Sequence, residues 1–237
     1  MSSAADDASA WAASALLHWP QQVVNLEVKL EVAARIAQRA ADGQTIGIGS
    51  GSAAFLTLWA VGRRVSEEGL RVEVVTTSYE TDVAAGRLGL TRTRLGEARP
   101  DWGVDGADEM DPAGRLLKGR GGALFREKLL WNTSARMVLA IDPSKHVDRL
   151  GSRFPVPVEV HPHAAELVAE RLLAAGCREV HLRTGAGKDG PVITESGFLL
   201  LDAHYDEIPA GLDARINAFP GVLETGLFEG FAYEVVE

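Results

Sequence analysis

The segment Thr45–Val65 constrains the fold most strongly, because four small residues join a short β-rich run to a helical run. Thr45–Ile48 predicts a strand, Gly49–Ser52 (GSGS) supplies a turn, and Ala53–Val65 predicts a helix. A strand that enters a helix through a glycine-rich turn is typical of the opening of a parallel α/β unit. We therefore expect a parallel sheet with helices packed against it.

The same alternation of strands and helices continues along the first part of the chain. We expect helices at Val23–Ala40, Glu80–Leu88 and Leu124–Trp131, and strands at Arg71–Thr76, Trp102–Val104 and Met137–Ile141. Five such alternations in about 140 residues favour a doubly wound sheet over a barrel. The predicted fold class is therefore α/β, with a Rossmann-like doubly wound parallel sheet.

The pattern changes after the proline-containing segment Phe154–Pro157. Beyond it we expect strands at Val158–Val160, Glu179–Arg183, Phe198–Leu201 and Val222–Leu227, and helices at Ala164–Ala175 and Leu212–Ala218. The order β-α-β-β-α-β is that of a small ferredoxin-like α+β module. We expect a Rossmann-like domain over 21–152 with a C-terminal return at 228–237, a ferredoxin-like domain over 153–227, and an N-terminal extension over 1–20.

Composition excludes several classes of partner. The 237-residue chain has a net charge of −9, whereas a broad nucleic-acid surface needs lysine and arginine to neutralise phosphates. A small anionic ligand stays compatible, because a few cations can be concentrated in one cleft. No apolar run approaches the ~20 residues that cross a bilayer, and Met1–Pro20 contains no lysine or arginine, unlike a targeting peptide. Cys177 is the only cysteine, which fits a reducing, cytoplasmic compartment.

The turn Gly49–Ser52 is a candidate phosphate-binding loop. Unpaired N–H groups and the dipole at a helix amino terminus favour an anion, and serine hydroxyls add donors. A tight turn that binds nothing is the plain alternative. A dinucleotide loop is a second alternative, because Gly49-x-Gly51-x-x-Ala54 fits that fingerprint. Its acidic residue would have to be Glu73, which we expect in mid-strand rather than at a strand's end.

Two aspartates follow the strand expected at Trp102–Val104. Asp105 and Asp108 are therefore expected at a strand's carboxyl end, where open α/β sheets carry their sites. A solvated acidic turn is the alternative. A metal site is disfavoured, because no histidine lies nearby and the spacing of Asp105, Asp108, Glu109 and Asp111 misses the calcium-loop pattern.

Glu127 is the candidate base. None of its helical neighbours three or four residues away (Ala123, Leu124, Leu130, Trp131) can pair with it. Arg126, Glu127 and Lys128 together sweep about 200° of the helix, so at least one of them faces packed protein. If Glu127 does so, desolvation raises the pKa of its carboxyl, which suits a general base near neutrality. A structural ion pair is the alternative reading, and the sequence favours neither.

Four blocks together resemble the type A ribose-5-phosphate isomerases: Gly47–Ser52 (GIGSGS), Asp105–Glu109 (DGADE), Lys118–Lys128 (KGRGGALFREK), and Ser144–Lys145 with Asp148. Phe154–Val160 (FPVPVEV) and Phe219–Phe228 (FPGVLETGLF) add support. The blocks occur in family order and cover most of the chain from Glu27 onward. The combination is highly specific, although no single block is.

The resemblance implies an enzyme of the pentose phosphate pathway that interconverts ribose 5-phosphate and ribulose 5-phosphate. It implies that Glu127 shuttles a proton between C1 and C2 through an enediolate, that Lys118 stabilises the oxyanion, and that Asp105 and Asp108 bind sugar hydroxyls and assist proton transfer. The implied substrate and phosphate contacts are Lys29, Gly49, Ser50, Gly51, Ser52, Gly119, Gly121 and Lys145. It also implies no metal, no organic cofactor, and a homodimer or homotetramer.

The sequence departs from the family pattern at Ala53, where threonine is usual, and at Arg120, where glycine is usual. Two other functions compete with the isomerase. One is acyl transfer from coenzyme A, in which related α/β folds use a glutamate nucleophile. The other is a non-catalytic sugar-phosphate sensor, which has no need to keep Glu127, Lys118, Asp105 and Asp108 together.

Overall fold

The computed structural model describes residues 15, 19 and 22–237 and divides them into two compact units. The first contains the described residues up to Gly106, together with Leu129–Asp142 and Ala232–Glu237. The second contains Ala107–Lys128 and Pro143–Phe231. The expected N-terminal extension lies outside the described residues, apart from Ala15 and Trp19.

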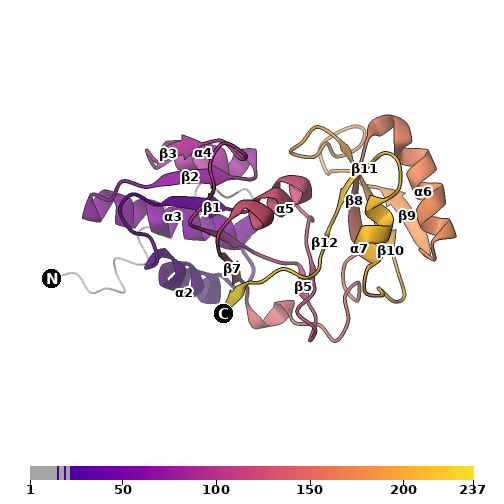
Figure 1. The fold of residues 1–237 in the computed structure, drawn as a ribbon, viewed down its shortest axis with the longest axis horizontal. Coiled ribbons are helices and arrows are strands. Elements are labelled where there is room, and N and C mark those ends of the chain that lie inside the picture. Colours follow the sequence, from indigo (N-terminus) through magenta and orange to yellow (C-terminus); the bar gives the residue numbers. More distant parts are fainter. Residues whose placement is uncertain (1–14, 16–18, 20–21) are drawn as a thin grey trace. The chain divides into compact units, whose positions relative to one another are not determined.

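The first unit is built on a six-stranded sheet in the described part of the chain, with the order β13-β7-β4-β1-β2-β3 (Figure 1). Every neighbouring pair is parallel. The strands are β1 (Thr45–Ile48), β2 (Glu73–Thr76), β3 (Thr91–Thr93), β4 (Trp102–Asp105), β7 (Met137–Ala140) and β13 (Glu234–Val236). The chain runs from β1 outward to β3 and then returns to β4 on the other side of β1. This reversal is the topological switch point of a doubly wound sheet, and the predicted α/β fold is confirmed.

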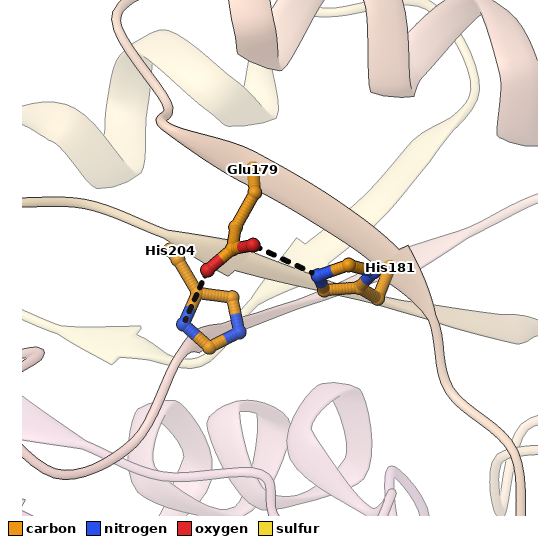
Figure 2. Close-up of side chains that lie close together, drawn as sticks. All are labelled: Glu179, His181 and His204. Atoms are coloured by element: carbon orange, nitrogen blue, oxygen red, sulfur yellow. Dashed lines mark hydrogen bonds and ion pairs between the residues drawn. The ribbon is translucent and has the colours of Figure 1, made fainter.

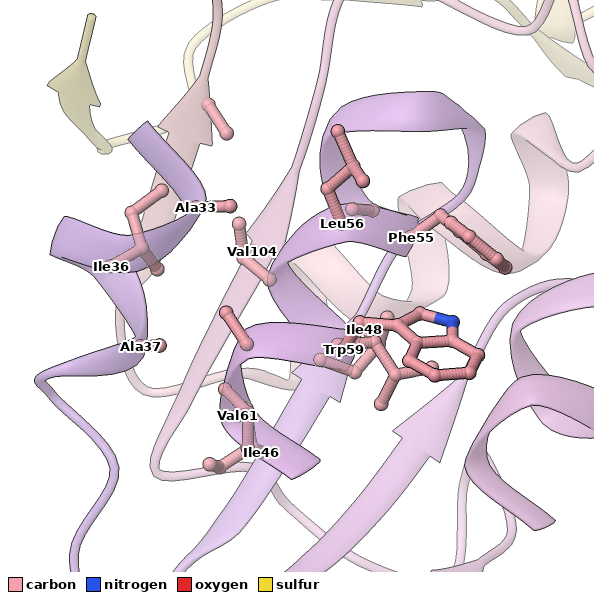
Figure 3. Packing of buried hydrophobic residues seen from close by; sticks show 14 of the residues in the cluster. Ala33, Ile36, Ala37, Ile46, Ile48, Phe55, Leu56, Trp59, Val61 and Val104 are labelled. Carbon is pink, nitrogen blue, oxygen red and sulfur yellow. The ribbon is translucent and has the colours of Figure 1, made fainter. Parts of the chain in front are cut away.

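Helices cover this sheet: α2 (Leu26–Ala37), α3 (Gly51–Glu68) and α4 (Tyr79–Arg87). Figure 3 shows Ile36 of α2, Phe55 of α3 and Ile48 of β1 in one apolar cluster. The ring of Trp19 packs 4.9 Å from that of Phe55. A fourth helix, α5 (Leu124–Thr133), begins in the second unit and ends in the first. Within the described residues, no helix combines the length and apolarity needed to cross a bilayer.

The second unit contains a four-stranded antiparallel sheet with the order β11-β8-β10-β9. Its elements are β8 (Val156–Val160), α6 (Ala165–Ala174), β9 (Glu179–Leu182), β10 (Leu199–His204), α7 (Leu212–Asn217) and β11 (Val222–Thr225). The succession β-α-β-β-α-β matches the expected ferredoxin-like order. Two 3₁₀ turns, Pro143–Lys145 and Pro162–Ala164, lie in the connections.

A second, three-stranded sheet in this unit was not expected from the sequence. It has the order β12-β6-β5 and joins Glu109–Met110 (β5) and Leu116–Leu117 (β6) to Leu227–Phe228 (β12). These pairings attach the segment 107–128 to the second unit, although we expected that segment in the Rossmann-like domain. Residues 143–152 also belong to the second unit, before the expected boundary at 153.

Glu109 helps to explain this division. Its side chain is fully buried, and its carboxylate accepts N–H groups from Gly151 at 2.6 Å, Arg153 at 2.7 Å and Phe154 at 3.0 Å. Three donors from one loop thus converge on one carboxylate. Hydrogen bonds to a charged group stabilise more than neutral ones, so this residue ties the loop that contains Gly151, Arg153 and Phe154 to β5.

We predict that Glu109→Gln lowers the free energy of unfolding by about 2–3 kcal/mol, because the amide NH₂ group must face a backbone donor. The measurement is the urea midpoint of the whole protein at unchanged m-value. Glu170→Gln, at an exposed position of α6, is the control and should change stability by less than about 0.5 kcal/mol. Equal midpoints for the two variants would contradict the anchoring role.

Candidate active site

The glycine-rich turn lies where β1 ends and α3 begins, in the first unit. Gly51 has a φ of +78°, which a residue with a side chain adopts only with strain. Lys29, a largely buried residue of α2, donates from Nζ to Ser52 Oγ at 3.0 Å. The first turn of α3 contains no acidic residue. A helix amino terminus and a nearby ammonium group therefore create positive potential at this turn, as a bound phosphate requires.

Asp105 lies beside this turn, at the end of β4 and next to β1 in the sheet. It is fully buried, and both of its carboxylate oxygens are held. Oδ1 accepts the N–H of Gly106 at 2.8 Å, and Oδ2 accepts the Nε1–H of Trp131 at 3.0 Å. A carboxylate fixed in this way still has lone pairs for a ligand hydroxyl. We did not identify Trp131 as a site residue from the sequence.

Gly49 is required by the close approach of Asp105. A Cβ at position 49 would lie 2.8 Å from the Asp105 Cβ and closer still to its carboxylate. The space that Asp105 occupies explains why the first residue of the turn is a glycine, and no unusual backbone angle is needed to explain it. The turn and the aspartate are therefore packed closely against each other.

We predict that Gly49→Ala lowers kcat/KM for a substrate of this site about 10- to 100-fold, since it displaces Asp105 by a fraction of an ångström or more. Overpacking should also cost about 1–3 kcal/mol of unfolding free energy. Gly185→Ala is the control, because a Cβ there meets only Val192, at 3.4 Å. If Gly49→Ala kept the activity of Gly185→Ala, the turn and Asp105 would not work together.

The structure does not support a dinucleotide-binding turn, because Glu73 does not lie where the fingerprint requires an acidic residue. Glu73 is the first residue of β2, is exposed, and is paired in register with Thr45 at the start of β1. Parallel strands that are paired in register begin at the same end of the sheet. Glu73 therefore lies at the amino ends of the strands, whereas the turn lies at their carboxyl ends. The fingerprint requires an acidic residue at the carboxyl end of the second strand.

Lys118 and Glu127 form a buried pair within the second unit. Lys118 is 3% exposed and Glu127 is 3% exposed, and Lys118 Nζ lies 3.6 Å from Glu127 Oε1. Lys118 follows β6, and its backbone N–H donates to Gly226 at 2.8 Å. Its ammonium group also lies 5.4 Å from the centre of the Phe228 ring. Both side chains of the pair are thus buried, and charge interactions are stronger there than in water.

The neighbours of Glu127 on α5 have structural partners. Lys128 is buried, and its Nζ lies 2.8 Å from Asp213 Oδ1 and 2.7 Å from Glu224 Oε1. Arg126 lies 3.7 Å from Glu195. Glu127 itself makes an ion pair, with Lys118, so the structural ion pair that we considered stays an alternative to the base.

The remaining residues that we predicted to contact the substrate differ in their exposure and in their neighbours. Asp108 is half-buried and accepts the N–H of Arg120 at 3.2 Å. Arg120 itself is exposed, with its guanidinium 5.3 Å from the Phe154 ring centre. The other predicted contacts differ in exposure: Gly119 is buried, Ser50 and Lys145 are half-buried, and Gly121 is exposed.

The predicted residues thus fall into two groups, one in each unit. Lys29, Gly49, Ser52 and Asp105 lie together in the first unit. Lys118 and Glu127 lie together in the second unit, where Asp108 contacts the backbone of Arg120. The first group suits an anion, and the second suits proton transfer beside a cation.

Comparison with known proteins identifies relatives over almost the whole chain. Residues 73–237 match the family model for ribose 5-phosphate isomerase A (phosphoriboisomerase A). Ribose-5-phosphate isomerase A of Methanothermobacter thermautotrophicus is 41% identical over 215 residues, which are 90% of this chain and 94% of that protein. The corresponding protein of Thermosynechococcus vestitus is 40% identical over 87% of this chain and 89% of that protein.

Solved structures agree. Ribose 5-phosphate isomerase A from Methanocaldococcus jannaschii has a TM-score of 0.86 and 36% identity, covering 90% of this chain and 96% of that one. A D-ribose-5-phosphate isomerase in complex with phospho-erythronic acid has a TM-score of 0.82 and 34% identity, covering 87% and 91% of the two chains. The resemblance inferred from the sequence blocks is thereby confirmed.

Proposed function

The chain belongs to the ribose 5-phosphate isomerase A family, which interconverts ribose 5-phosphate and ribulose 5-phosphate, and on this premise we propose that Glu127 is the base of that reaction. The carboxylate removes the proton from C2 of the open-chain aldose, which leaves an enediolate. It returns the proton to C1, which gives the ketose. One carboxylate can perform both steps, because the proton that it takes from C2 is the proton that it delivers to C1.

The observation that carries this proposal is the buried pair of Lys118 and Glu127, 3.6 Å apart. A base in a desolvated position works efficiently near neutral pH. A fixed ammonium group beside it stabilises the negative charge that develops on the enediolate oxygens. Lys128 does not offer this chemistry, because Asp213 and Glu224 already neutralise it.

We assign the substrate phosphate to the turn Gly49–Ser52 together with Lys29. The supporting observations are the amino terminus of α3 and the hydrogen bond from Lys29 to Ser52. A ligand that combines a phosphate with a polyol acid, phospho-erythronic acid, occurs in the complex of one solved relative. Lys145, Ser50, Gly119 and Gly121 are proposed as further contacts with the sugar phosphate.

Asp105 and Asp108 receive the sugar hydroxyls in this proposal. Asp105 is held rigidly by Gly106 and Trp131, so it suits orientation of a hydroxyl rather than movement. Asp108 is more exposed and suits the proton exchange between O1 and O2 that accompanies isomerisation.

We predict that the purified chain converts ribose 5-phosphate to ribulose 5-phosphate at an unchanged rate after dialysis against EDTA. The physical reason is that a lysine and a carboxylate supply both the charge and the base. Product formation is followed by NMR, with and without chelator. Turnover that disappears with EDTA and returns with a divalent ion would contradict the mechanism, and binding without turnover would favour the sensor.

A further inference from the structure

A second group of ligand-type side chains lies on β9 and β10 of the four-stranded sheet. In this antiparallel pair Glu179 is directly opposite His204, and His181 is opposite Asp202. Directly opposite residues share a face of a sheet, and so do residues two apart in one strand. The register therefore puts Glu179, His181 and His204 on one face, and Figure 2 shows the carboxylate between the two imidazole rings.

The distances between these side chains are close to those of a metal-binding set. Glu179 Oε2 lies 3.3 Å from His181 Nε2, and Glu179 Oε1 lies 4.0 Å from His204 Nδ1. One ligand atom from each residue lies within 4.8 Å of the other two. Tetrahedral zinc, with bonds of about 2.0–2.1 Å, needs its ligand atoms roughly 3.3 Å apart. Modest side-chain rotations close the remaining gap, and side-chain exposures of 33–62% leave room for them.

We propose that Glu179, His181 and His204 bind a transition-metal ion of the Zn²⁺ class. Two imidazoles and one carboxylate are borderline ligands, which select Zn²⁺, Co²⁺, Ni²⁺ or Cu²⁺ over Mg²⁺ and Ca²⁺. Three protein ligands leave the fourth tetrahedral position to water. The described residues contain one such three-ligand group, and it includes none of the residues assigned to the isomerase reaction.

The surroundings of Glu179 suit a ligand. Arg178 donates from Nη2 to Glu179 Oε1 at 2.9 Å and from Nη1 to Asp206 Oδ1 at 3.3 Å. The hydrogen bond from Arg178 to Oε1 orients the carboxylate, and Oε2 faces His181 Nε2, the atom that would share the ion with it. Because β9 is an edge strand, a bound ion would link that edge to β10.

The test uses the untagged full chain, first treated with EDTA and then desalted. ZnCl₂ is titrated against a chromophoric chelator, and MgCl₂ in excess is the selectivity control. We expect saturable binding of one Zn²⁺ per chain that Mg²⁺ does not displace. His181→Ala and His204→Ala should each weaken it at least about 10-fold. Zn²⁺ should raise Tm in the wild type but not in these variants, and isomerase turnover should be unchanged.

The double variant His161→Ala/His163→Ala is the matched control. These two rings are also close, 5.1 Å between centroids, but His161 Nδ1 already accepts the N–H of His163. In the described part of the chain no carboxylate completes that pair into a three-ligand group. The control should keep wild-type affinity. Absence of saturable binding, or equal losses in the control and in His181→Ala, would overturn the proposal.

Discussion

Replacing Glu127 with glutamine is expected to lower kcat for ribose 5-phosphate isomerisation by about 10³-fold, within the usual range for loss of a general base. Glutamine has nearly the same shape but cannot accept the C2 proton. KM should change by less than about threefold, because the amide keeps the volume and polarity of the position. The measurement is steady-state kinetics on protein whose fold is checked by its thermal transition.

Glu159→Gln is the matched control for this variant. Glu159 is a fully buried glutamate of the same unit, and its hydroxyl partner is Thr194. Burial raises the pKa of the Glu159 carboxyl, and we expect its replacement by a neutral amide to cost little stability. It should leave kcat within a few-fold of the wild type. Comparable activity in the two variants would remove Glu127 from its proposed role.

Replacing Lys118 with methionine should lower kcat/KM by about 10²–10³-fold, the effect of removing one stabiliser of a developing oxyanion. The change should also destabilise the fold by about 3–5 kcal/mol, because Glu127 is then a buried carboxylate without its nearby cation. Kinetics and urea unfolding are measured on the same preparation. The loss of kcat/KM should be larger than the loss that the fraction of unfolded protein would cause.

Two further variants separate catalysis from stability. Lys128→Met also removes a buried lysine, but one that pairs with Asp213 and Glu224. We expect it to lose stability and to keep kcat per folded molecule within a few-fold. The double variant Lys118→Met/Glu127→Gln should regain stability relative to Lys118→Met, since the carboxylate is removed together with the cation of its ion pair. If Lys118→Met and Lys128→Met lost the same activity, Lys118 would be only structural.

The local parts of the fold were predictable from the sequence. The strand, turn and helix around Gly49–Ser52 follow from residues next to one another, as does the position of Asp105 at the carboxyl end of β4. The ferredoxin-like order was predictable for the same reason, because each element is long enough to show its own periodicity. β3, β5 and β6 were missed, since strands of two or three residues have no periodicity to detect.

Long-range partners were not predictable. β6 pairs with β12, which lies about 110 residues later in the chain, and this pairing assigns 107–128 to the second unit. Trp131 was considered only as a neighbour of Glu127 on one helix, whereas its Nε1–H goes to Asp105. The side chains of three consecutive charged residues cover more than half of the circumference of a helix. Only their partners decide which of Arg126, Glu127 and Lys128 lies beside Lys118.

The most direct measurement of the central claim is exchange of the C1 hydrogen of ribulose 5-phosphate in D₂O, followed by proton NMR. It reports proton removal from carbon itself, independently of net turnover. We predict that the wild type exchanges this hydrogen and that Glu127→Gln does so at least about 10²-fold more slowly, while binding phospho-erythronic acid with similar affinity. Exchange near the wild-type rate in a folded, ligand-binding Glu127→Gln variant would contradict the account.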